Sequence, residues 1–197
     1  LCLFILFAVM GSRAGSMDFP AMKAAMPGPG PTLTGLFALA LAGFGMKAGL
    51  MPFHFWLPEA HPVAPSHASA VLSAVVLKMV VYGLLRFVSL CPVVPRSWGV
   101  VLVALGMVSA VLGLLFAMAQ RDLKRLLAYS SIENVGIIAM GAGLGCLGLA
   151  HGDPALAAVG FAAALLHVLN HSLFKALLFL GAGAYGQALG SRAIEGA

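Results

Sequence analysis

The sequence predicts an all-α protein: a polytopic bundle of transmembrane helices, seen here as a fragment with about 4–5 spans, one of them broken. Its 197 residues are 61% hydrophobic and only 9% charged, and the mean hydropathy is +1.04. A soluble domain carries about 25% charged residues, so this chain would have too little polar surface to face water. Apolar stretches of about 20 residues, the length that crosses a bilayer, recur along it.

The apolar stretches place the expected elements within a single transmembrane domain that covers residues 1–197. We expect the tail of a span at 1–10, a broken helix at 33–60, and helices at 67–90, 98–119, 122–150 and 155–187. The break is placed at Gly49–Pro52, because glycine and proline interrupt helices. Residues 11–31, rich in Gly, Pro and Met, are expected to form a loop. The chain begins inside an apolar run, so we expect a piece of a longer protein.

The charges are distributed as in a membrane protein, not as on a nucleic-acid-binding face. The net charge is +5, and seven of the eleven basic residues fall in expected loops: Arg13, Lys23, Arg96, Arg121, Lys124, Arg125 and Arg192. Basic loops mark the cytoplasmic side of a membrane protein. The dense cluster at 121–125 therefore predicts that its side is cytoplasmic, in the inner (cytoplasmic) membrane of a prokaryote.

No pattern for a cofactor or a catalytic centre is found in the sequence. The three cysteines, Cys2, Cys91 and Cys146, are far apart and form no CxxC pair, which argues against iron–sulfur or zinc ligation. There is no GxGxxG motif after a strand and no nucleophile–base set. We expect no cofactor, no metal ligand and no catalytic residue in this chain, so that any electron transfer takes place in other subunits.

Two lysines within apolar segments are the first candidates for function. A lysine at the centre of a membrane helix costs about 2.5–3.5 kcal/mol on insertion scales. Burial favours the neutral amine and a nearby carboxylate favours the ammonium, so a lysine held between these influences can accept and release a proton. Lys78 lies near the middle of its span, and Lys47 lies beside the expected break, where free carbonyls suit a buried cation. The alternatives are a structural or snorkelling role for Lys78 and contact with water for Lys47.

The last expected helix carries a stripe of titratable side chains. His167, His171 and Lys175 are spaced i, i+4 and i+8, so they drift by only about 40° around the helix axis. They would form a ladder about 12 Å long, able to carry protons. The alternative, strongest for His167, is a histidine that is satisfied within the core.

Glu133 is the only acid placed within a span. It is interpreted as a proton site or a counter-charge for a lysine of a neighbouring helix. The alternative is a carboxylate paired with Lys124 or Arg125 in the first turn of its own helix. Around the proline-rich turn, Glu59, His61 and His67 are interpreted mainly as structural or interfacial.

Three blocks of sequence resemble the antiporter-like membrane subunits of respiratory complex I, of cation/proton antiporters and of membrane-bound hydrogenases. The first comprises KAGLMPFHFWLPEAH at 47–61, APS at 64–66 and LKMVVYGLLR at 77–86; the others are DLKRLLAYSS at 122–131 and HSLFKALLFL at 171–180. The continuation SIENVGII at 131–138 looks like the hydrogenase-4 or formate hydrogenlyase branch. Complex I relatives tend to carry a histidine near Asn134, which this chain lacks.

The resemblance implies roles for individual residues. Lys47 matches the family's lysine on a broken helix and Lys78 its central lysine, while His171 and Lys175 match a bridging site. The family also uses a glutamate on an earlier helix and an ionisable residue on a later broken helix, and neither is in this chain. The implied partners are other membrane-arm subunits, a peripheral hydrogenase or iron–sulfur arm, and the lipid bilayer.

We therefore expect proton translocation, with Na⁺ as the alternative ion, by the membrane arm of a redox complex of the hydrogenase-4 or formate hydrogenlyase type. One alternative is a subunit of a complex I-type NADH:quinone oxidoreductase. Another is a secondary cation/proton antiporter without redox partners, and a third is a scaffold whose buried charges are structural.

Overall fold

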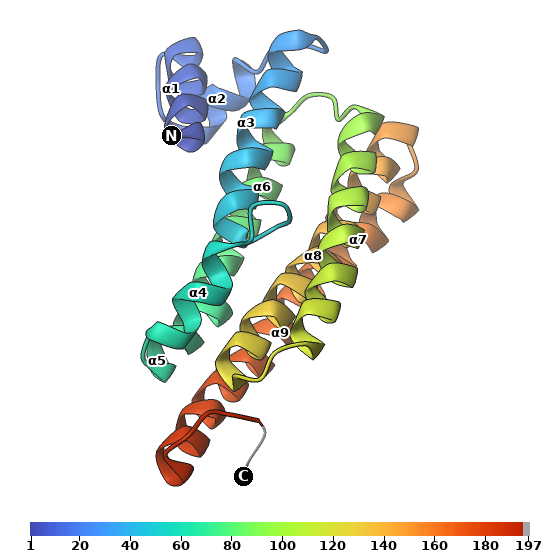
Figure 1. Ribbon diagram of the computed structural model, residues 1–197. Coiled ribbons are helices and arrows are strands. Elements are labelled where there is room, and N and C mark those ends of the chain that lie inside the picture. Colours follow the sequence, from blue (N-terminus) through green and yellow to red (C-terminus); the bar gives the residue numbers. More distant parts are fainter. Residues whose placement is uncertain (195–197) are drawn as a thin grey trace.

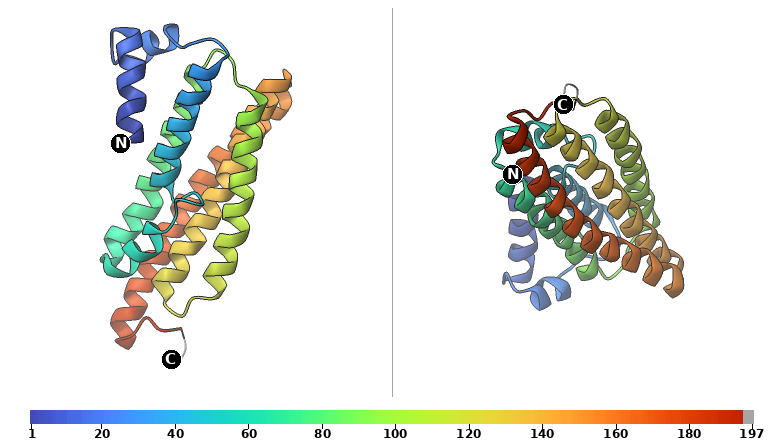
Figure 2. Two further views of the ribbon diagram at one scale, coloured as in Figure 1. Left: turned by 45° about the horizontal axis from the view of Figure 1, so that its top comes forward. Right: turned by 90° about the horizontal axis from the view of Figure 1, so that it is seen from below.

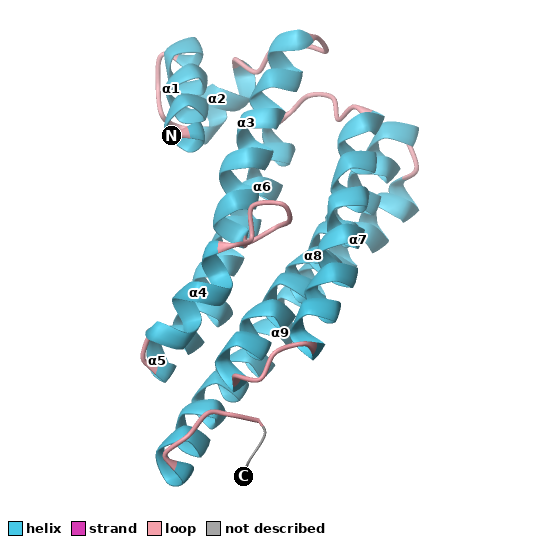
Figure 3. Ribbon diagram, viewed as in Figure 1, coloured by secondary structure: helices cyan, strands magenta, loops and turns pink. Residues whose placement is uncertain are grey.

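The computed structural model describes residues 1–194, and in this part the regular elements are all helices (Figures 1 and 3). They are α1 (Cys2–Ala14), α2 (Phe19–Ala24), α3 (Pro31–Ala48), α4 (Trp56–Val63), α5 (Ser66–Val71), a π-helical turn η1 (Leu72–Val76), α6 (Leu77–Leu90), α7 (Arg96–Met118), α8 (Leu123–His151) and α9 (Pro154–Leu189). Within the described residues five helices are long and apolar enough to cross a membrane, with α5, η1 and α6 counted as one. The expected all-α fold class is confirmed.

The spans run up and down between two ends of the bundle. The loops that follow α2, α6 and α8 lie at one end, whereas the turns after α4 and α7 and the segment after α9 lie at the other (Figure 1). In Figure 2, α8 lies between α7 and α9, and α3 packs beside α6. The cluster of basic residues at 121–125 is therefore at the end opposite Arg96, as expected from loops that alternate sides.

Helices α7 and α8 touch through their backbones. A Cβ atom on Gly136 would lie 2.5 Å from the Gly106 carbonyl oxygen and 2.6 Å from the Ala110 nitrogen. On the other side of α8, a Cβ on Gly141 would lie 3.0 Å from the Ala164 nitrogen of α9. Small residues at such contacts let membrane helices approach closely, and van der Waals packing then holds them. Glycine thus places α8 in the centre of the bundle.

The broken helix is found where the sequence predicts it. Helix α3 ends at Gly49, whose φ of 76° is left-handed and favours glycine. A turn with a cis Met51–Pro52 peptide follows, and the chain becomes helical again at Trp56. The Met51 N–H donates to Ser109 Oγ of α7 at 2.9 Å, and Trp56 Nε1 donates to the Met46 carbonyl at 2.8 Å.

Two expectations for local structure need correction. The stretch 11–31 is not a continuous loop, because it contains α2, which has proline in its first turn and a buried side chain at Met22. Proline is pre-organised for the start of a helix, so the same residue that suggests a loop begins a short helix here. The expected helix at 67–90 is also not uniform, since residues 72–76 form a π-helical turn.

We predict that Gly136→Val lowers the free energy of unfolding by about 1–3 kcal/mol, because the new side chain would overlap with backbone atoms of α7. The measurement is the melting temperature of the full-length protein in detergent. Gly181→Val is the matched control, since a Cβ at Gly181 meets nothing within 4 Å. Equal melting temperatures for the two variants would contradict the backbone contact.

Candidate proton-conducting site

The site lies where η1 and α6 face α8 and α9, and Lys78 enters it from α6. Its side chain is 8% exposed, and Nζ donates to the Ser73 carbonyl at 2.5 Å. This carbonyl is available because of the π-helical turn: the Leu77 N–H donates to the Leu72 carbonyl five residues back, and so passes over Ser73. The turn thus supplies an acceptor for a charge that would otherwise be buried without one.

Lys175 enters the site from α9 and is fully buried. Its Nζ donates to the Leu127 carbonyl of α8 at 2.9 Å. The Ser131 hydroxyl donates to the same carbonyl at 2.9 Å. Among residues 1–194 neither this ammonium group nor that of Lys78 is hydrogen-bonded to a carboxylate, because both are bound by backbone carbonyls.

A pair of serine hydroxyls lies between the two lysines. Ser73 Oγ and Ser131 Oγ are 2.9 Å apart, and both side chains are fully buried. Lys78 thus binds the Ser73 carbonyl, while Ser131 and Lys175 share the Leu127 carbonyl. The Ser73 residue itself joins the lysine contact at its carbonyl to the Ser131 contact at its hydroxyl. This pair could not be recognised from the sequence, because serines are common at helix contacts in membranes and do not titrate.

The expected histidine stripe is present, and its members differ in environment. His171 is fully buried, and neither ring nitrogen has a hydrogen-bond partner within the described chain. Its ring lies nearly parallel to that of His167, with the centroids 6.4 Å apart. His167 is half-buried, and its Nε2 lies 2.9 Å from Asn134 Oδ1 of α8. The structure therefore brings His167, His171, Lys175 and Lys78 to one region of the bundle.

Glu133 lies on α8 beside this region and is half-buried. The Ser130 hydroxyl lies 3.4 Å from its carboxylate, and the carboxylate acts electrostatically on Lys175 and His167. The alternative pairing in the first turn of α8 is wrong. Arg125 instead pairs with Glu59 at 2.6 Å, and Lys124 Nζ donates to the Ala64 carbonyl at 2.8 Å.

Within residues 1–194 the structure does not bring Lys47 to the other candidates. It lies in the last turn of α3, and its side chain is exposed. It lines an apolar pocket with residues of α1, such as Phe4 and Phe7. The buried face of this turn is formed instead by Gly45 and Ala48, so the lysine points out of the described bundle.

His61 of α4 was expected to be structural or interfacial, but the structure buries it completely. Its ring stacks on Phe179 of α9 at a centroid distance of 4.5 Å, and neither ring nitrogen has a partner in the described chain. Phe179 follows Lys175 by one helical turn. Prolines on both sides of His61 suggested a surface turn, which hid its burial.

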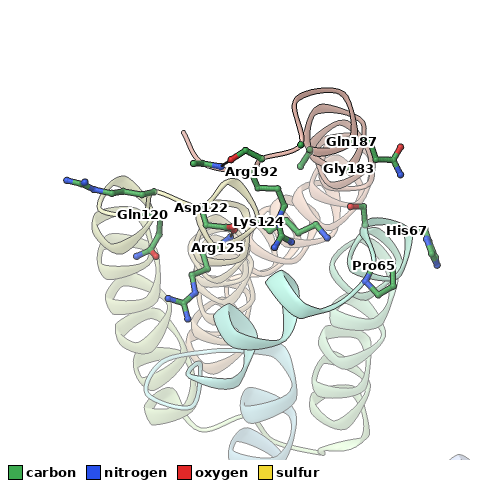
Figure 4. Close-up of a pocket in the computed structure, with 16 residues that line it drawn as sticks. Pro65, His67, Gln120, Asp122, Lys124, Arg125, Gly183, Gln187 and Arg192 are labelled. Carbon is green, nitrogen blue, oxygen red and sulfur yellow. Dashed lines mark hydrogen bonds and ion pairs between the residues drawn. The ribbon is translucent and has the colours of Figure 1, made fainter. Parts of the chain in front are cut away.

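A polar pocket of about 950 Å³ opens at the end of the bundle that carries the basic cluster (Figure 4). It lies between α5, the α7–α8 turn, the end of α9 and the segment after it. Lys124 and Arg192 reach across towards the α4–α5 turn, where Arg192 Nη1 donates to the Pro62 carbonyl at 2.7 Å. Arg192 also lies 3.8 Å from Asp122. These cations are therefore engaged in holding the turn against α8.

The fold and the site define a polytopic membrane protein with a buried lysine–histidine centre. Over residues 1–195 the chain matches the family described as "NADH:quinone oxidoreductase/Mrp antiporter, TM". It belongs to this family and is part of an integral membrane protein.

Two relatives from Escherichia coli (strain K12) are similar over most of this chain. Hydrogenase-4 component B is 49% identical over 185 residues, which are 92% of this chain and 27% of the relative. Formate hydrogenlyase subunit 3 is 41% identical over 195 residues, 99% of this chain and 32% of the relative. The chain thus spans between a quarter and a third of the length of these relatives.

A solved structure of the Mrp complex from Dietzia sp. DQ12-45-1b contains a similar chain. The likeness has a TM-score of 0.83 and 34% sequence identity, and it covers 100% of this chain and 21% of that one. The arrangement of helices described here therefore occurs in a chain of that complex.

We predict that a cysteine in the polar pocket is open to water and that a cysteine beside His61 is not. In a full-length protein whose native cysteines are replaced by alanine, Ser191→Cys at the exposed rim should react with a membrane-impermeant maleimide. Ser69→Cys, at a fully buried serine that donates to the His61 carbonyl, should react only after unfolding. Mass spectrometry measures both, and comparable labelling of the two sites would contradict the structure.

Proposed function

We propose that the protein to which this chain belongs translocates protons, as a membrane subunit of a redox complex of the hydrogenase-4 or formate hydrogenlyase type. The observation that carries the proposal is the pair Lys78 and Lys175, two buried lysines bound by carbonyls and joined through hydroxyls. A carboxylate partner would hold each lysine in the charged form. Carbonyl acceptors solvate an ammonium less strongly, so the buried lysine can give up its proton.

Repulsion between like charges couples the sites to one another. Each lysine acts electrostatically on His171, and Lys175 acts on Lys78. A proton that arrives on one of them therefore disfavours a second charge nearby, so that the sites titrate as a coupled group. The His171 imidazole has no hydrogen-bond partner among residues 1–194, and His167 with Asn134 extends the polar path along α8 and α9.

We place the complex in the inner (cytoplasmic) membrane of a prokaryote, with the basic end of the bundle in the cytoplasm. The distribution of basic residues and the two bacterial relatives support this location. The proposed partners are further membrane-arm subunits and a peripheral hydrogenase or iron–sulfur arm. The redox groups would lie in that arm, and this chain would contribute the proton path without a cofactor of its own.

A second candidate is a secondary cation/proton antiporter, which works without redox partners. The similarity to a chain of the Mrp complex over the whole of this chain favours it. The block SIENVGII at 131–138, which contains Glu133 and Asn134, favours the redox complex, as does the 49% identity to hydrogenase-4 component B. Reconstituted complexes decide between the two: the first candidate moves protons only while the electron donor is being oxidised.

We predict that Lys78→Ala in the full-length protein lowers proton transport per assembled complex to about a tenth or less, because a positioned proton-transfer group is lost. Transport is measured with a pH-sensitive dye in sodium-free liposomes, and assembly by native gel. Lys23→Ala is the control, since Lys23 is an exposed lysine of α2. Full transport by an assembled Lys78→Ala complex would exclude the proposed relay and favour the scaffold.

A further inference from the structure

We propose that Ser73 and Ser131 are positioning residues that couple Lys78 to Lys175, so that proton transfer between the two lysines depends on this hydroxyl pair. The inference rests on the proposed function and adds residues to it. It stands on the geometry of four helical elements, since α6, η1, α8 and α9 each contribute one part of the connection.

Ser73 is hydrogen-bonded both through its backbone carbonyl and through its side-chain hydroxyl. Its carbonyl accepts from Lys78 Nζ, and its hydroxyl lies 2.9 Å from that of Ser131. A movement of this residue would therefore change the lysine contact and the serine contact together. The π-helical turn makes the arrangement possible, because it leaves the Ser73 carbonyl to the lysine.

Ser131 acts on the opposite lysine through a shared acceptor. Its hydroxyl donates to the Leu127 carbonyl, which also accepts from Lys175 Nζ. Each hydroxyl has one proton to donate, so with the Ser131 proton on Leu127 the Ser73 hydroxyl must donate to Ser131. Both hydroxyls then donate in the same direction, from Ser73 of η1 towards the Leu127 carbonyl that binds Lys175.

Such a chain responds to the charge of the lysine at its end. When Lys175 carries its proton, the ammonium and the Ser131 hydroxyl compete for the Leu127 carbonyl. When the lysine is neutral, its weaker bond leaves more of the carbonyl to Ser131, and linked hydrogen bonds polarise one another in a low-dielectric interior. The electrostatic field at the Ser73 carbonyl, and hence at Lys78, therefore changes with the charge of Lys175. The hydroxyl pair therefore fixes the two lysine acceptors relative to each other and carries the influence of one charge to the other.

The test uses the full-length protein in its assembled complex, reconstituted in liposomes, with Ser73→Ala, Ser131→Ala and the double variant. We expect each single variant to lower proton transport per complex about tenfold. The double variant should fall no further than the worse single one, because either change breaks the same bond. Ser131→Thr or Ser73→Thr, which keep the hydroxyl, should restore transport. An alanine variant that fails to assemble is replaced by cysteine, which fills the space but hydrogen-bonds weakly.

Ser172→Ala is the matched control, since this serine of α9 donates only to the Val168 carbonyl of its own helix. The proposal is overturned if the alanine variants lower the melting temperature but keep full transport per complex, which is the result for a purely structural contact. It is also overturned if the two losses multiply in the double variant. Lys78→Ala distinguishes a failure of the serine proposal from a failure of the proposed function. If it abolishes transport and the serine variants do not, only the coupling through Ser73 and Ser131 is wrong. If none of them affects transport, the proposed function itself fails.

Discussion

The rest of the structure depends on one constraint, the burial of two lysine ammonium groups in a bilayer-spanning bundle where no carboxylate of residues 1–194 is bonded to either. Each group needs an acceptor, and a backbone carbonyl can provide one either where a helix leaves it unbonded or through its second lone pair. The π-helical turn offers the carbonyl of Ser73 to Lys78, and the Leu127 carbonyl accepts from Lys175. Both solutions use the main chain, which no single side-chain substitution can remove.

The central position of α8 follows from the same need. Leu127 can bind Lys175 of α9, and Ser131 can bind Ser73 of η1, only if α8 lies within reach of both elements. A glycine on α8 provides the approach to α9, because Gly141 meets the backbone of the helix that carries Lys175. The packing of α8 against α9 thus also places the polar site.

Much of the fold was predictable from sequence, because length and hydropathy determine where a chain can cross a bilayer. The break at Gly49–Pro52 and the burial of Lys78, His171 and Lys175 were predictable for the same reason. What could not be predicted depends on neighbours in space. The π-helical turn leaves no compositional mark, the serine pair joins residues 58 positions apart, and the exposure of Lys47 depends on which face of α3 is covered.

The turn in the broken helix is tied to the helix pair across from it, and this gives the molecule a mechanical property. The Met51 N–H is held by Ser109 of α7, while α7 is locked to α8 through Gly106 and Gly136. The turn is therefore bonded to α7, and α7 is packed closely against α8. A displacement of α8 beside the lysines would therefore act on the end of α3 through these packing contacts, without a continuous chain of titratable groups.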